Sequence, residues 1–549
     1  MRGVTEQHEG QQVEGHGGDL ALAALKAFGV REMFTLSGGH VFPLYDAAER
    51  AGLRLLDVRH EQSAVFAAEA VAKLQRRPGL AVLTAGPGVT NGISGLTSAF
   101  FNAAPVIVLG GRAPQFRWGA GSLQELDHVP LVRPVTKHAE TVYSTEDIPA
   151  RLQHAAVVAL TAHRGPVFLD LPLDVVFSHG EVAIPSTVEV PVIEPDPDEV
   201  ARAAALLAGA QRPVVIAGSD VYGADAVAAL REAAEALGVP VFTNGMGRGA
   251  LPPEHPLAFA RARRAALGGA DVVCVIGTPL DFRLSFGDFG DAQVVHIVDA
   301  PSQRASQVNT AASPAGDLRL ILAGLAASPG ASPTTHADWV ARLRTVEDAA
   351  RAADVDALQA DTDPIKPSRV YGELRKVLDR DAVTIGDGGD FVSYAGKYLE
   401  PAQPGTWLDP GPYGCLGTGM GYAMGARVTY PDRQVCVLMG DGAAGFSLMD
   451  VESLVRQRLP VVIVLGNNGI WGLEKHPMRA IFGYDVAADL QPGLRYDDVV
   501  RALGGAGETV AKPADIGPAL RRAFDAGVPY LVNVLTDPED AYPRSSNLA

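Results

Sequence analysis

The chain of 549 residues has few cysteines, few aromatic residues and no excess of positive charge. Its three cysteines lie far apart, which excludes a disulfide framework and the usual ligand spacing of a structural zinc site. The formal net charge of −17 argues against a nucleic-acid partner, because phosphate backbones are bound by basic faces. No apolar run approaches the roughly 20 residues of a membrane helix, so we expect no membrane partner either. Without a secretory signal or paired cysteines, we expect a cytoplasmic protein.

Short runs of Val, Ile and Leu alternate with helical stretches rich in Ala and Leu. Such nearly uninterrupted apolar strands are typical of parallel sheets that are covered by helices on both faces. Examples of the predicted strands are 80–85, 104–111, 166–172, 213–218, 271–277, 293–299, 434–440 and 460–467. The pattern predicts an α/β fold.

Proline-rich stretches with little periodicity divide the chain at 184–200 and again at 328–336 and 361–367. A length of 549 residues is compatible with three domains of this class. We therefore predict three doubly wound parallel-sheet domains and no visible internal repeat. Their predicted bounds are 19–183, 195–345 and 366–540, preceded by a disordered arm over 1–18.

The stretch GDGAAGFSLMDVESLVRQRLPVVIVLGNNG covers residues 440–469. Asp441 follows one buried strand and Asn468 follows the next, so both are expected at carboxyl ends of strands, where open α/β sheets bind ligands. One carboxylate, one amide oxygen and a loop carbonyl suit Mg²⁺ and leave positions for diphosphate oxygens and water. Gly442 would let backbone N–H groups approach a phosphate, and Ser447 is expected to cap the following helix. The interval across a complete helix and strand argues against a plain turn.

This stretch closely resembles the thiamine-diphosphate motif, in which Gly-Asp-Gly is followed after a nearly fixed gap by Asn-Asn. Enzymes of that family have pyrimidine-binding, central and diphosphate-binding domains, and the resemblance covers residues 18 to about 538. It implies bound thiamine diphosphate and Mg²⁺, with Asp441, Asn468 and the Ile470 carbonyl as metal ligands. The other residues expected beside the diphosphate are Gly440, Gly442 and Ala443.

The family also uses a carboxylate that hydrogen-bonds N1′ of the aminopyrimidine, and Glu61 in LRLLDVRHEQSAVFAAEAVAKL (53–74) takes that position. TAGPGVTNG (84–92) fails as a Rossmann fingerprint but matches the family's Gly-Pro-Gly loop near the cofactor. In GPYGCLGTGMGYAMGA (411–426), Leu416 takes the place of the bulky residue beneath the bent cofactor. Residues alone would favour a helix-dipole role for Glu61 and ordinary core for Leu416. The predicted pyrimidine-side residues are Glu61, Gly86, Pro87, Gly88, Asn91, Gly414 and Leu416.

Two subfamilies compete for the activity. HEQSAVFAAEAVAK, TAGPGVTNG and GSLQELDHVPLVRPVTKH resemble the acetolactate synthase catalytic subunit. GTPLDFRLSFG, WLDPGPYGCLGTGMGYA, GFSLMDVESLVRQRLPVVIV and RYDDVVRALGG resemble 2-hydroxyacyl-CoA lyase and oxalyl-CoA decarboxylase over longer blocks. We therefore favour a lyase that cleaves a 2-hydroxyacyl-CoA to formyl-CoA and an aldehyde or ketone. The alternative is acetolactate synthase, which condenses two pyruvates with decarboxylation.

A third reading from a different class is a catalytically silent thiamine-binding subunit. The presence of Glu61, Asp441 and Asn468 together argues against it. The expected substrate is therefore an acyl-CoA or a 2-oxoacid, and proton transfer needs side chains near it. We identify Glu474, His476 and His40 for that role and Gln124 for orienting a substrate oxygen. Solvated ion pairs with Lys475 and Arg479 would also explain Glu474 and His476.

The sequence also suggests a binding site for CoA phosphates and a nucleotide site in the central domain. The phosphates of CoA need basic anchors, and Arg261, Arg263 and Arg264 are candidates, although a solvated helix face explains them as well. VVIAGSDVYGADA (214–226) and HIVDA (296–300) resemble the nucleotide site that holds FAD in synthases and ADP in oxalyl-CoA decarboxylase. The family places its active sites between two chains, which implies a homo-oligomer, with a tetramer expected.

Overall fold

The computed structural model describes residues 11–185, 188–330 and 332–543. The chain divides into two units. Unit 1 comprises Met1–Pro191, Pro410–Tyr430 and Glu452–Gln457, and unit 2 comprises Val192–Asp409, Pro431–Val451 and Arg458–Ala549. Within the described residues, no helix has the length and apolar character needed to span a membrane.

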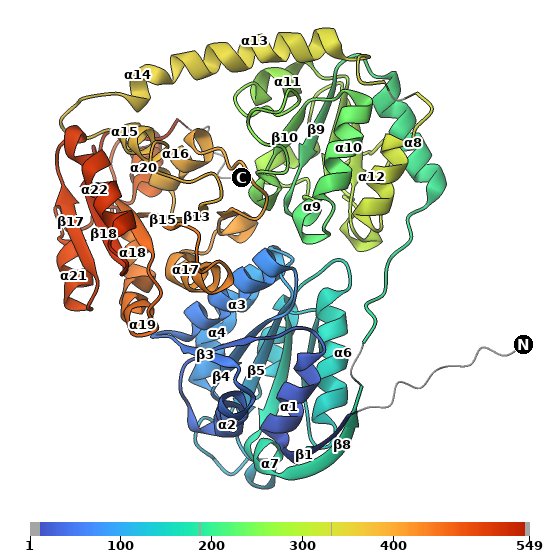
Figure 1. Ribbon diagram of the computed structural model, residues 1–549, viewed down its shortest axis with the longest axis vertical. Coiled ribbons are helices and arrows are strands. Elements are labelled where there is room, and N and C mark those ends of the chain that lie inside the picture. Colours follow the sequence, from blue (N-terminus) through green and yellow to red (C-terminus); the bar gives the residue numbers. More distant parts are fainter. Residues whose placement is uncertain (1–10, 186–187, 331, 544–549) are drawn as a thin grey trace, which may run out of the picture. The chain divides into compact units, whose positions relative to one another are not determined.

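Unit 1 contains a six-stranded sheet in the order β3-β2-β4-β5-β7-β6, with every pairing parallel. Its strands are β2 (Glu32–Thr35), β3 (Arg54–Asp57), β4 (Gly79–Leu83), β5 (Val106–Arg112), β6 (His138–Thr141) and β7 (Val167–Pro172). One face packs against α1 (Gly17–Lys26), α2 (Phe42–Ala51) and α6 (Ile148–Leu160) (Figure 1). The other face packs against α3 (Glu61–Gln75) and α4 (Pro87–Phe101).

The beginning of the described chain corrects the predicted arm over 1–18. Residues 11–16 form β1 (Gln11–His16), which pairs antiparallel with β8 (His179–Ile184). His16 then caps α1 in a capping box with Asp19, and a Cβ on Gly18 would overlap the Pro43 carbonyl. Edge pairing and close helix packing therefore order residues 11–18, while residues 1–10 lie outside the described residues.

Unit 2 begins with a four-stranded parallel sheet in the order β10-β9-β11-β12. Its strands are β9 (Pro213–Ala217), β10 (Val241–Thr243), β11 (Val272–Ile276) and β12 (Gln293–Ile297). One apolar core joins the sheet to α8 (Pro197–Gly209), α10 (Val227–Leu237) and α12 (Leu318–Ala326). A second core on the opposite face includes residues of α11 (Arg263–Gly269) and α13 (Ala337–Ala353).

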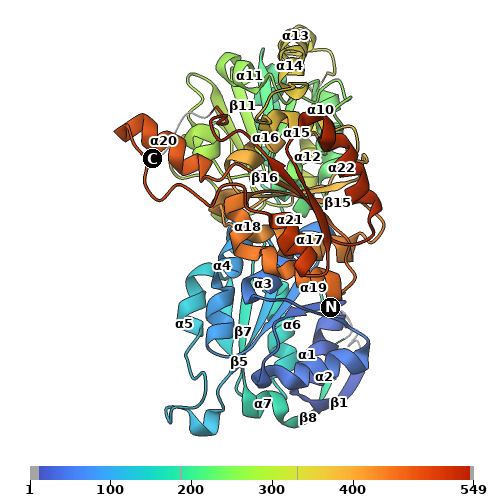
Figure 2. The ribbon, with the colours of Figure 1, turned by 90° about the vertical axis from the view of Figure 1, so that its left-hand side faces the viewer.

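The second sheet of unit 2 has six parallel strands in the order β14-β13-β15-β16-β18-β17. They are β13 (Val383–Asp387), β14 (Trp407–Leu408), β15 (Val435–Gly440), β16 (Val462–Asn467), β17 (Ala506–Val510) and β18 (Tyr530–Leu535). One face packs against α15 (Pro367–Leu374), α16 (Asp390–Tyr398) and α22 (Pro513–Asp525) (Figure 2). The remaining helices are α5 (Val129–Val132), α7 (Leu173–Phe177), α9 (Ser219–Gly223), α14 (Val355–Leu358), α17 (Thr418–Thr429), α18 (Asp441–Ser447), α19 (Val451–Arg456), α20 (Gly472–Phe482) and α21 (Tyr496–Ala502).

The two six-stranded sheets share one topology, although the sequence shows no repeat. When strands are counted along the chain within each sheet, both sheets read 2-1-3-4-6-5, and the central sheet reads 2-1-3-4. Each order reverses between its first and third strands, and open α/β sheets bind ligands at the carboxyl ends of the strands at such a reversal. The prediction of three doubly wound parallel-sheet domains is confirmed. The three reversals lie between β2 and β4, β9 and β11, and β13 and β15.

Candidate cofactor site

Asp441 and the turn after Asn468 lie together at the carboxyl edge of the last sheet. β15 and β16 are adjacent parallel strands, so both ends of the Gly-Asp-Gly to Asn-Asn stretch reach one edge. The Asp441 carboxylate accepts hydrogen bonds from the backbone N–H groups of Gly469 (2.7 Å) and Gly442 (3.1 Å). Gly469 has φ +70°, and the Asn468 side-chain oxygen accepts from the Ile470 N–H at 3.2 Å.

The chemistry of this cluster fits a hard divalent cation. Asp441 is buried, and burial raises its pKa to about 6 despite the backbone N–H groups that favour the charged form. A nearby cation would compensate the loss of hydration that this carboxylate suffers on burial. The neighbouring donors, the Asn468 amide oxygen and the Ile470 carbonyl, are oxygen ligands of the kind that Mg²⁺ prefers.

The helix after Asp441 differs in part from the expectation for Ser447. α18 begins at Asp441 and ends at Ser447. Ser447 takes the N-cap position of the 3-10 turn Leu448–Asp450 that leads into α19, as expected, but its side chain makes no capping hydrogen bond. Gly440 takes the cap position without a side chain, and Gly442 lies against Trp471. A Cβ on Gly442 would lie 2.5 Å from the indole ring, so that close approach requires glycine here.

The loop after β13 belongs to the same edge and was not predicted. Gly388 has φ +124°, and a Cβ there would lie 3.3 Å from both the Ala443 Cβ and the Gly440 nitrogen. This loop therefore touches the start of α18 at the point where the strand order reverses. Its sequence signal is Gly-Asp-Gly-Gly (386–389), which follows a short apolar strand.

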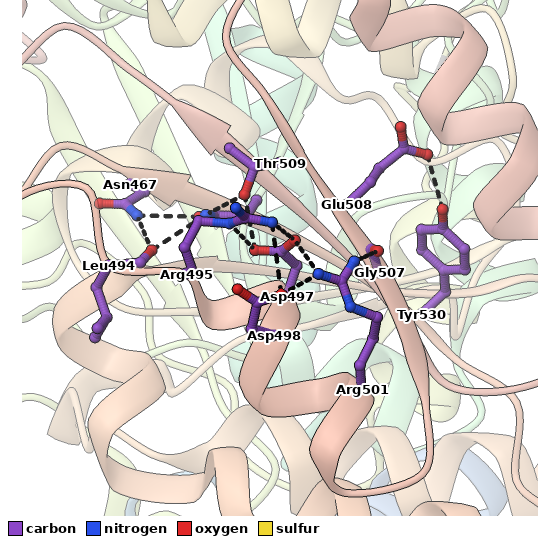
Figure 3. Close-up of polar contacts among 11 residues, drawn as sticks. Asn467, Leu494, Arg495, Asp497, Asp498, Arg501, Gly507, Glu508, Thr509 and Tyr530 are labelled. Carbon is purple, nitrogen blue, oxygen red and sulfur yellow. Dashed lines mark hydrogen bonds and ion pairs between the residues drawn. The ribbon is translucent and has the colours of Figure 1, made fainter.

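A buried polar network supports the Asn-Asn turn from the other side (Figure 3). Asn467 donates to the Leu494 carbonyl at 2.9 Å and to the Asn533 side-chain oxygen at 3.1 Å. Asn533 donates to Thr509, whose hydroxyl donates to the buried Asp497 carboxylate at 2.7 Å. Burial opposes ionisation of Asp497, but hydrogen bonds from Arg495 and Thr509 lower its pKa to about 2.

Tyr496 connects this network to the predicted metal ligand. Its hydroxyl donates to the backbone carbonyl of Asp441 at 3.3 Å. The turn after Asn468 is therefore held both by the Asp441 carboxylate and by side chains from β17, β18 and α21.

In unit 1, Glu61 and the Gly-Pro-Gly turn also come together. Glu61 opens α3 and is buried, and its Oε2 accepts from the Asn91 amide at 3.0 Å. Gly88 lies at the start of α4, where a Cβ would be 3.8 Å from the Glu61 carboxylate. The resemblance assigns Glu61, Gly88 and Asn91 to the pyrimidine side of the cofactor, and in the structure these residues lie near one another.

His40 and Gln124 lie beside the same turn. His40 Nδ1 is 3.3 Å from the Thr84 hydroxyl, and burial lowers the pKa of His40 below its ordinary 6.5. Gln124 has φ +60°, a left-handed conformation that is uncommon for a residue with a side chain. A Cβ on Gly86 would lie 2.9 Å from the Gln124 Cβ, so these two backbones are in close contact. His40, Gly86 and Gln124 thus surround the reversal between β2 and β4.

Gly414 and Leu416 precede α17, which packs closely on α3 within unit 1. Leu416 is only partly buried, so ordinary core packing does not account for it, and Gly414 has φ +69°. A Cβ on Gly425 of α17 would lie 2.5 Å from the Ala67 carbonyl of α3. The glycines of α17 thus permit its backbone to approach α3.

The contact between α17 and α3 encloses a carboxylate that sequence reasoning missed. Glu69 is fully buried, and its Oε1 accepts from Tyr422 (2.8 Å) and Asn102 (2.7 Å). Burial raises its pKa, against the effect of Lys73 and of these hydrogen bonds. Within helix α3, only its position among small apolar residues could have indicated a buried charge.

Glu474 and His476 lie on α20, two and four residues after the helix begins. Glu474 is exposed and His476 is partly buried. The neighbouring cations pair elsewhere: Lys475 binds Asp485 and Asp489, and Arg479 binds Asp485. Carboxylates other than Glu474 therefore form the ion pairs of Lys475 and Arg479.

The three arginines of 261–264 lie at a cavity of about 920 Å³ within unit 2. Arg261 is bound to the Asp354 carboxylate at 2.8 Å, whereas Arg263 donates to the Asn244 side chain at 2.6 Å. Arg264 lines the cavity as well. The cavity also receives Arg248, whose pKa is lowered by burial. It is a basic cavity in an acidic protein, which suits an anionic ligand.

Comparison with known families defines the class of enzyme. Residues 15–131 match the thiamine pyrophosphate enzyme N-terminal TPP binding domain, and residues 387–534 match the C-terminal TPP binding domain. Residues 200–325 match the central domain of the same enzymes. The chain therefore belongs to the thiamine pyrophosphate enzyme family, and the protein is a thiamine-diphosphate-dependent enzyme.

The individual relatives include two kinds of enzyme. A "Probable acetolactate synthase" from Mycobacterium bovis is 50% identical over 539 residues, which cover 97% of this chain and 98% of the relative. The "Acetolactate synthase large subunit IlvG" of Mycobacterium tuberculosis matches to the same extent. A "2-hydroxyacyl-CoA lyase 2" from Caenorhabditis elegans is 35% identical over 545 residues, covering 90% of this chain and 84% of the relative.

These relatives overturn the preference for a 2-hydroxyacyl-CoA lyase. That preference depended on a few C-terminal blocks, whereas identity over nearly the whole chain is greater with the acetolactate synthases. The prediction of the lyase was wrong, and the alternative is better supported.

Proposed function

We propose that this protein is an acetolactate synthase, which condenses two pyruvates and releases carbon dioxide. The observation that carries the proposal is the 50% identity with acetolactate synthases over 97% of the chain. The substrate is then a 2-oxoacid, and the reaction takes up one proton for each acetolactate formed. No CoA ester is needed.

The proposal assigns a role to the pyrimidine-side residues and another to the metal-side residues. When bound, thiamine diphosphate supplies the electron sink that allows a bond next to a carbonyl carbon to break. Glu61, oriented by Asn91, would hold the aminopyrimidine ring, and Gly414 and Leu416 would support it. Asp441, Asn468 and the Ile470 carbonyl would bind Mg²⁺, which would hold the diphosphate beside Gly440, Gly442 and Ala443.

Pyruvate requires groups that orient its oxygens and transfer a proton. We assign Gln124 to a substrate oxygen because its strained backbone is held against the cofactor turn. The lowered pKa of His40 keeps its imidazole neutral at pH 7 and able to exchange a proton. Glu474 and His476 are the further proton-transfer candidates, on a helix that begins four residues after Asn468.

The basic cavity of unit 2 supports a nucleotide in the central domain. Asn244, Gly245 and Arg263 line it at the carboxyl end of the central sheet, next to β10. Its arginines suit the phosphates of either ADP or FAD, and a bound nucleotide would be structural. Release of the ligand by denaturation, followed by mass measurement, distinguishes the two nucleotides from an empty site.

The enzyme is expected to work as a homo-oligomer. The pyrimidine-side residues belong to unit 1 and the metal-side residues to unit 2. In the family that this chain joins, the two halves come from different chains, so we propose at least a dimer and expect a tetramer. Light scattering at several protein concentrations, with and without cofactor, measures the assembly.

The function is tested by supplying pyruvate with thiamine diphosphate and Mg²⁺ and measuring acetolactate. A parallel reaction contains a short 2-hydroxyacyl-CoA and measures formyl-CoA. Acetolactate from the wild type and none from Glu61→Gln supports the proposal. Cofactor binding without any product would indicate a silent thiamine-binding subunit, and formyl-CoA without acetolactate would refute the synthase.

A further inference from the structure

His128 is a fully buried histidine that has a hydrogen-bond partner on each ring nitrogen, and the proposed chemistry does not use it. It lies immediately before α5, and its Nε2 accepts the Gly86 backbone N–H at 2.9 Å. A nitrogen that accepts cannot carry a proton, so the ring proton must be on Nδ1. Nδ1 lies 2.9 Å from the Asp170 carboxylate and donates to it. The ring therefore joins a buried anion to one backbone amide.

Asp170 is held on both oxygens. It lies in β7 and is fully buried, and its second oxygen accepts from Arg112 at 2.8 Å. Arg112 also binds Asp127 at 3.1 Å, and its guanidinium stacks 3.8 Å above the centre of the Trp118 ring. Arg112 thus occupies one oxygen of Asp170, and the other oxygen accepts the Nδ1–H of His128, which fixes this tautomer of the ring.

The amide that His128 holds belongs to a turn that only glycine can form easily. Gly86 has φ +59° and ψ −113° and begins α4. The same short turn touches each predicted catalytic group of unit 1. Thr84 contacts His40, Gly86 contacts the backbone of Gln124, and Asn91 of α4 holds Glu61. A shift of the Gly86 amide would therefore move the supports of all three groups.

His128 also fixes the loop that carries Gln124. It follows Gln124 by four residues, and the backbone between them contains no regular element. One end of this segment is anchored by the ring of His128, and the other is in contact with Gly86. The left-handed conformation of Gln124 thus depends on the same buried bond.

We propose that His128, kept in its Nδ1–H form by Asp170 and Arg112, is a positioning residue for the active site. Its role is to hold the Gly86 turn, and through that turn Gln124 and Glu61, in the geometry that binds cofactor and substrate. This inference rests on the proposed function. It goes further by assigning a task to three buried residues that lie outside the cofactor motifs.

The test compares two amides that differ only in reach. In His128→Gln the amide oxygen can occupy the position of Nε2 and accept from Gly86, whereas in His128→Asn it can reach only the position of Nδ1. We expect His128→Gln to keep kcat and thiamine diphosphate affinity within about threefold. We expect His128→Asn to lose roughly 10- to 100-fold in kcat, with a similar loss of cofactor affinity and a higher KM for pyruvate. A buried N–H is left unpaired, and the turn that supports Glu61 and Gln124 moves.

Matched controls separate positioning from stability. His336 is an equally buried histidine in unit 2, and His336→Asn should lower the melting temperature without changing cofactor affinity. Asp170→Asn tests the same hydrogen-bond chain from the side of the carboxylate. The introduced amide can donate to Nδ1 of His128, so the ring proton moves to Nε2, where it faces the Gly86 N–H. This variant should reproduce the loss seen in His128→Asn. If His128→Asn does not fold, Asp170→Asn supplies the comparison with His128→Gln.

Cofactor affinity is measured by calorimetric titration of the metal-loaded protein, and it does not depend on which substrate the enzyme uses. A higher affinity of His128→Gln than of His128→Asn supports the inference even if no acetolactate forms, in which case the proposed function alone fails. Equal cofactor affinity and equal kcat in His128→Gln and His128→Asn would overturn the inference. The inference would also be overturned if the loss of cofactor affinity simply paralleled the loss of melting temperature in these two variants and in His336→Asn.

Discussion

Replacing Asp441 by asparagine should stabilise the cofactor-free protein while abolishing cofactor binding. Burial raises the pKa of Asp441 from 3.8 to about 6, so the ionised carboxylate is less favourable in the folded than in the unfolded chain. The folded state loses stability as the pH rises from about 4 to about 6, and the full effect persists above that range. A shift of about two units corresponds to roughly 3 kcal/mol at about 1.4 kcal/mol per unit.

Asparagine is a neutral isostere of the protonated acid, so Asp441→Asn removes this penalty. At pH 7.5 with a chelator present, we expect the variant to be more stable than the wild type by up to about 3 kcal/mol. At pH 4 the two proteins should be nearly equal. With Mg²⁺ and thiamine diphosphate the order reverses, because only the wild type gains stability from ligand binding.

The assay is thermal unfolding at pH 4 and 7.5, with chelator or with cofactor and Mg²⁺. Asp497→Asn is the matched control, since its carboxylate is buried in the same unit but has a lowered pKa of about 2. This variant should lose stability at pH 7.5 under both conditions (Figure 3). The reasoning is refuted if Asp441→Asn is less stable than the wild type without cofactor, or if it binds cofactor and Mg²⁺ with wild-type affinity.

Three further substitutions probe burial and close packing. Glu69→Gln keeps an oxygen for the Tyr422 and Asn102 hydrogen bonds but removes a carboxylate whose pKa is raised by burial. The stability of this variant relative to the wild type should therefore increase as the pH rises above 4.5. Melting temperatures across pH measure the difference, and a difference that does not change with pH would contradict the prediction. Gly442→Ala should displace Trp471, costing about 1–3 kcal/mol and weakening cofactor binding in a titration, whereas Gly445→Ala in the same helix meets no atom within 4 Å and should be neutral. Gly425→Val should separate α17 from α3 and lower the melting temperature of the apo protein; an unchanged value would show that the close approach is not needed.

Much of the fold follows from local sequence patterns. All eight predicted strands are present within one to two residues, because buried parallel strands are continuous apolar runs. Asp441 and the Asn468 turn come together as expected, because they follow strands that pair in parallel. Other strands were not named from the sequence, including β13, β18 and the short β6 and β14. β6 and β14 carry little apolar sequence of their own and are defined by pairing with neighbouring strands.

Residues far apart in the chain were harder to foresee. His128 and Asp170 meet Gly86 only because β4, β5 and β7 are neighbours in the sheet, and no local pattern encodes that order. Ser447 takes the N-cap position that its residue type suggests, but an additional short helix, α18, precedes it and begins at Asp441. The polar segment 11–16 forms a strand because it pairs antiparallel with β8.

The choice between synthase and lyase could not be made correctly from short sequence blocks. Similarity over a few blocks favoured the lyase, whereas identity over nearly the whole chain favours the synthase. The side chains that we propose to contact the substrate, such as Gln124 and His40, are positioned by loop and sheet contacts of unit 1. Their arrangement becomes visible only in the folded chain.

The most direct test of the central claim is the balance of products from pyruvate alone. Purified protein with thiamine diphosphate and Mg²⁺ is given pyruvate, and carbon dioxide, acetolactate and acetaldehyde are quantified together. The account predicts equal amounts of carbon dioxide and acetolactate, no acetaldehyde, and no product from Glu61→Gln. Carbon dioxide accompanied by acetaldehyde, or intact pyruvate after prolonged incubation with cofactor-bound enzyme, would contradict it.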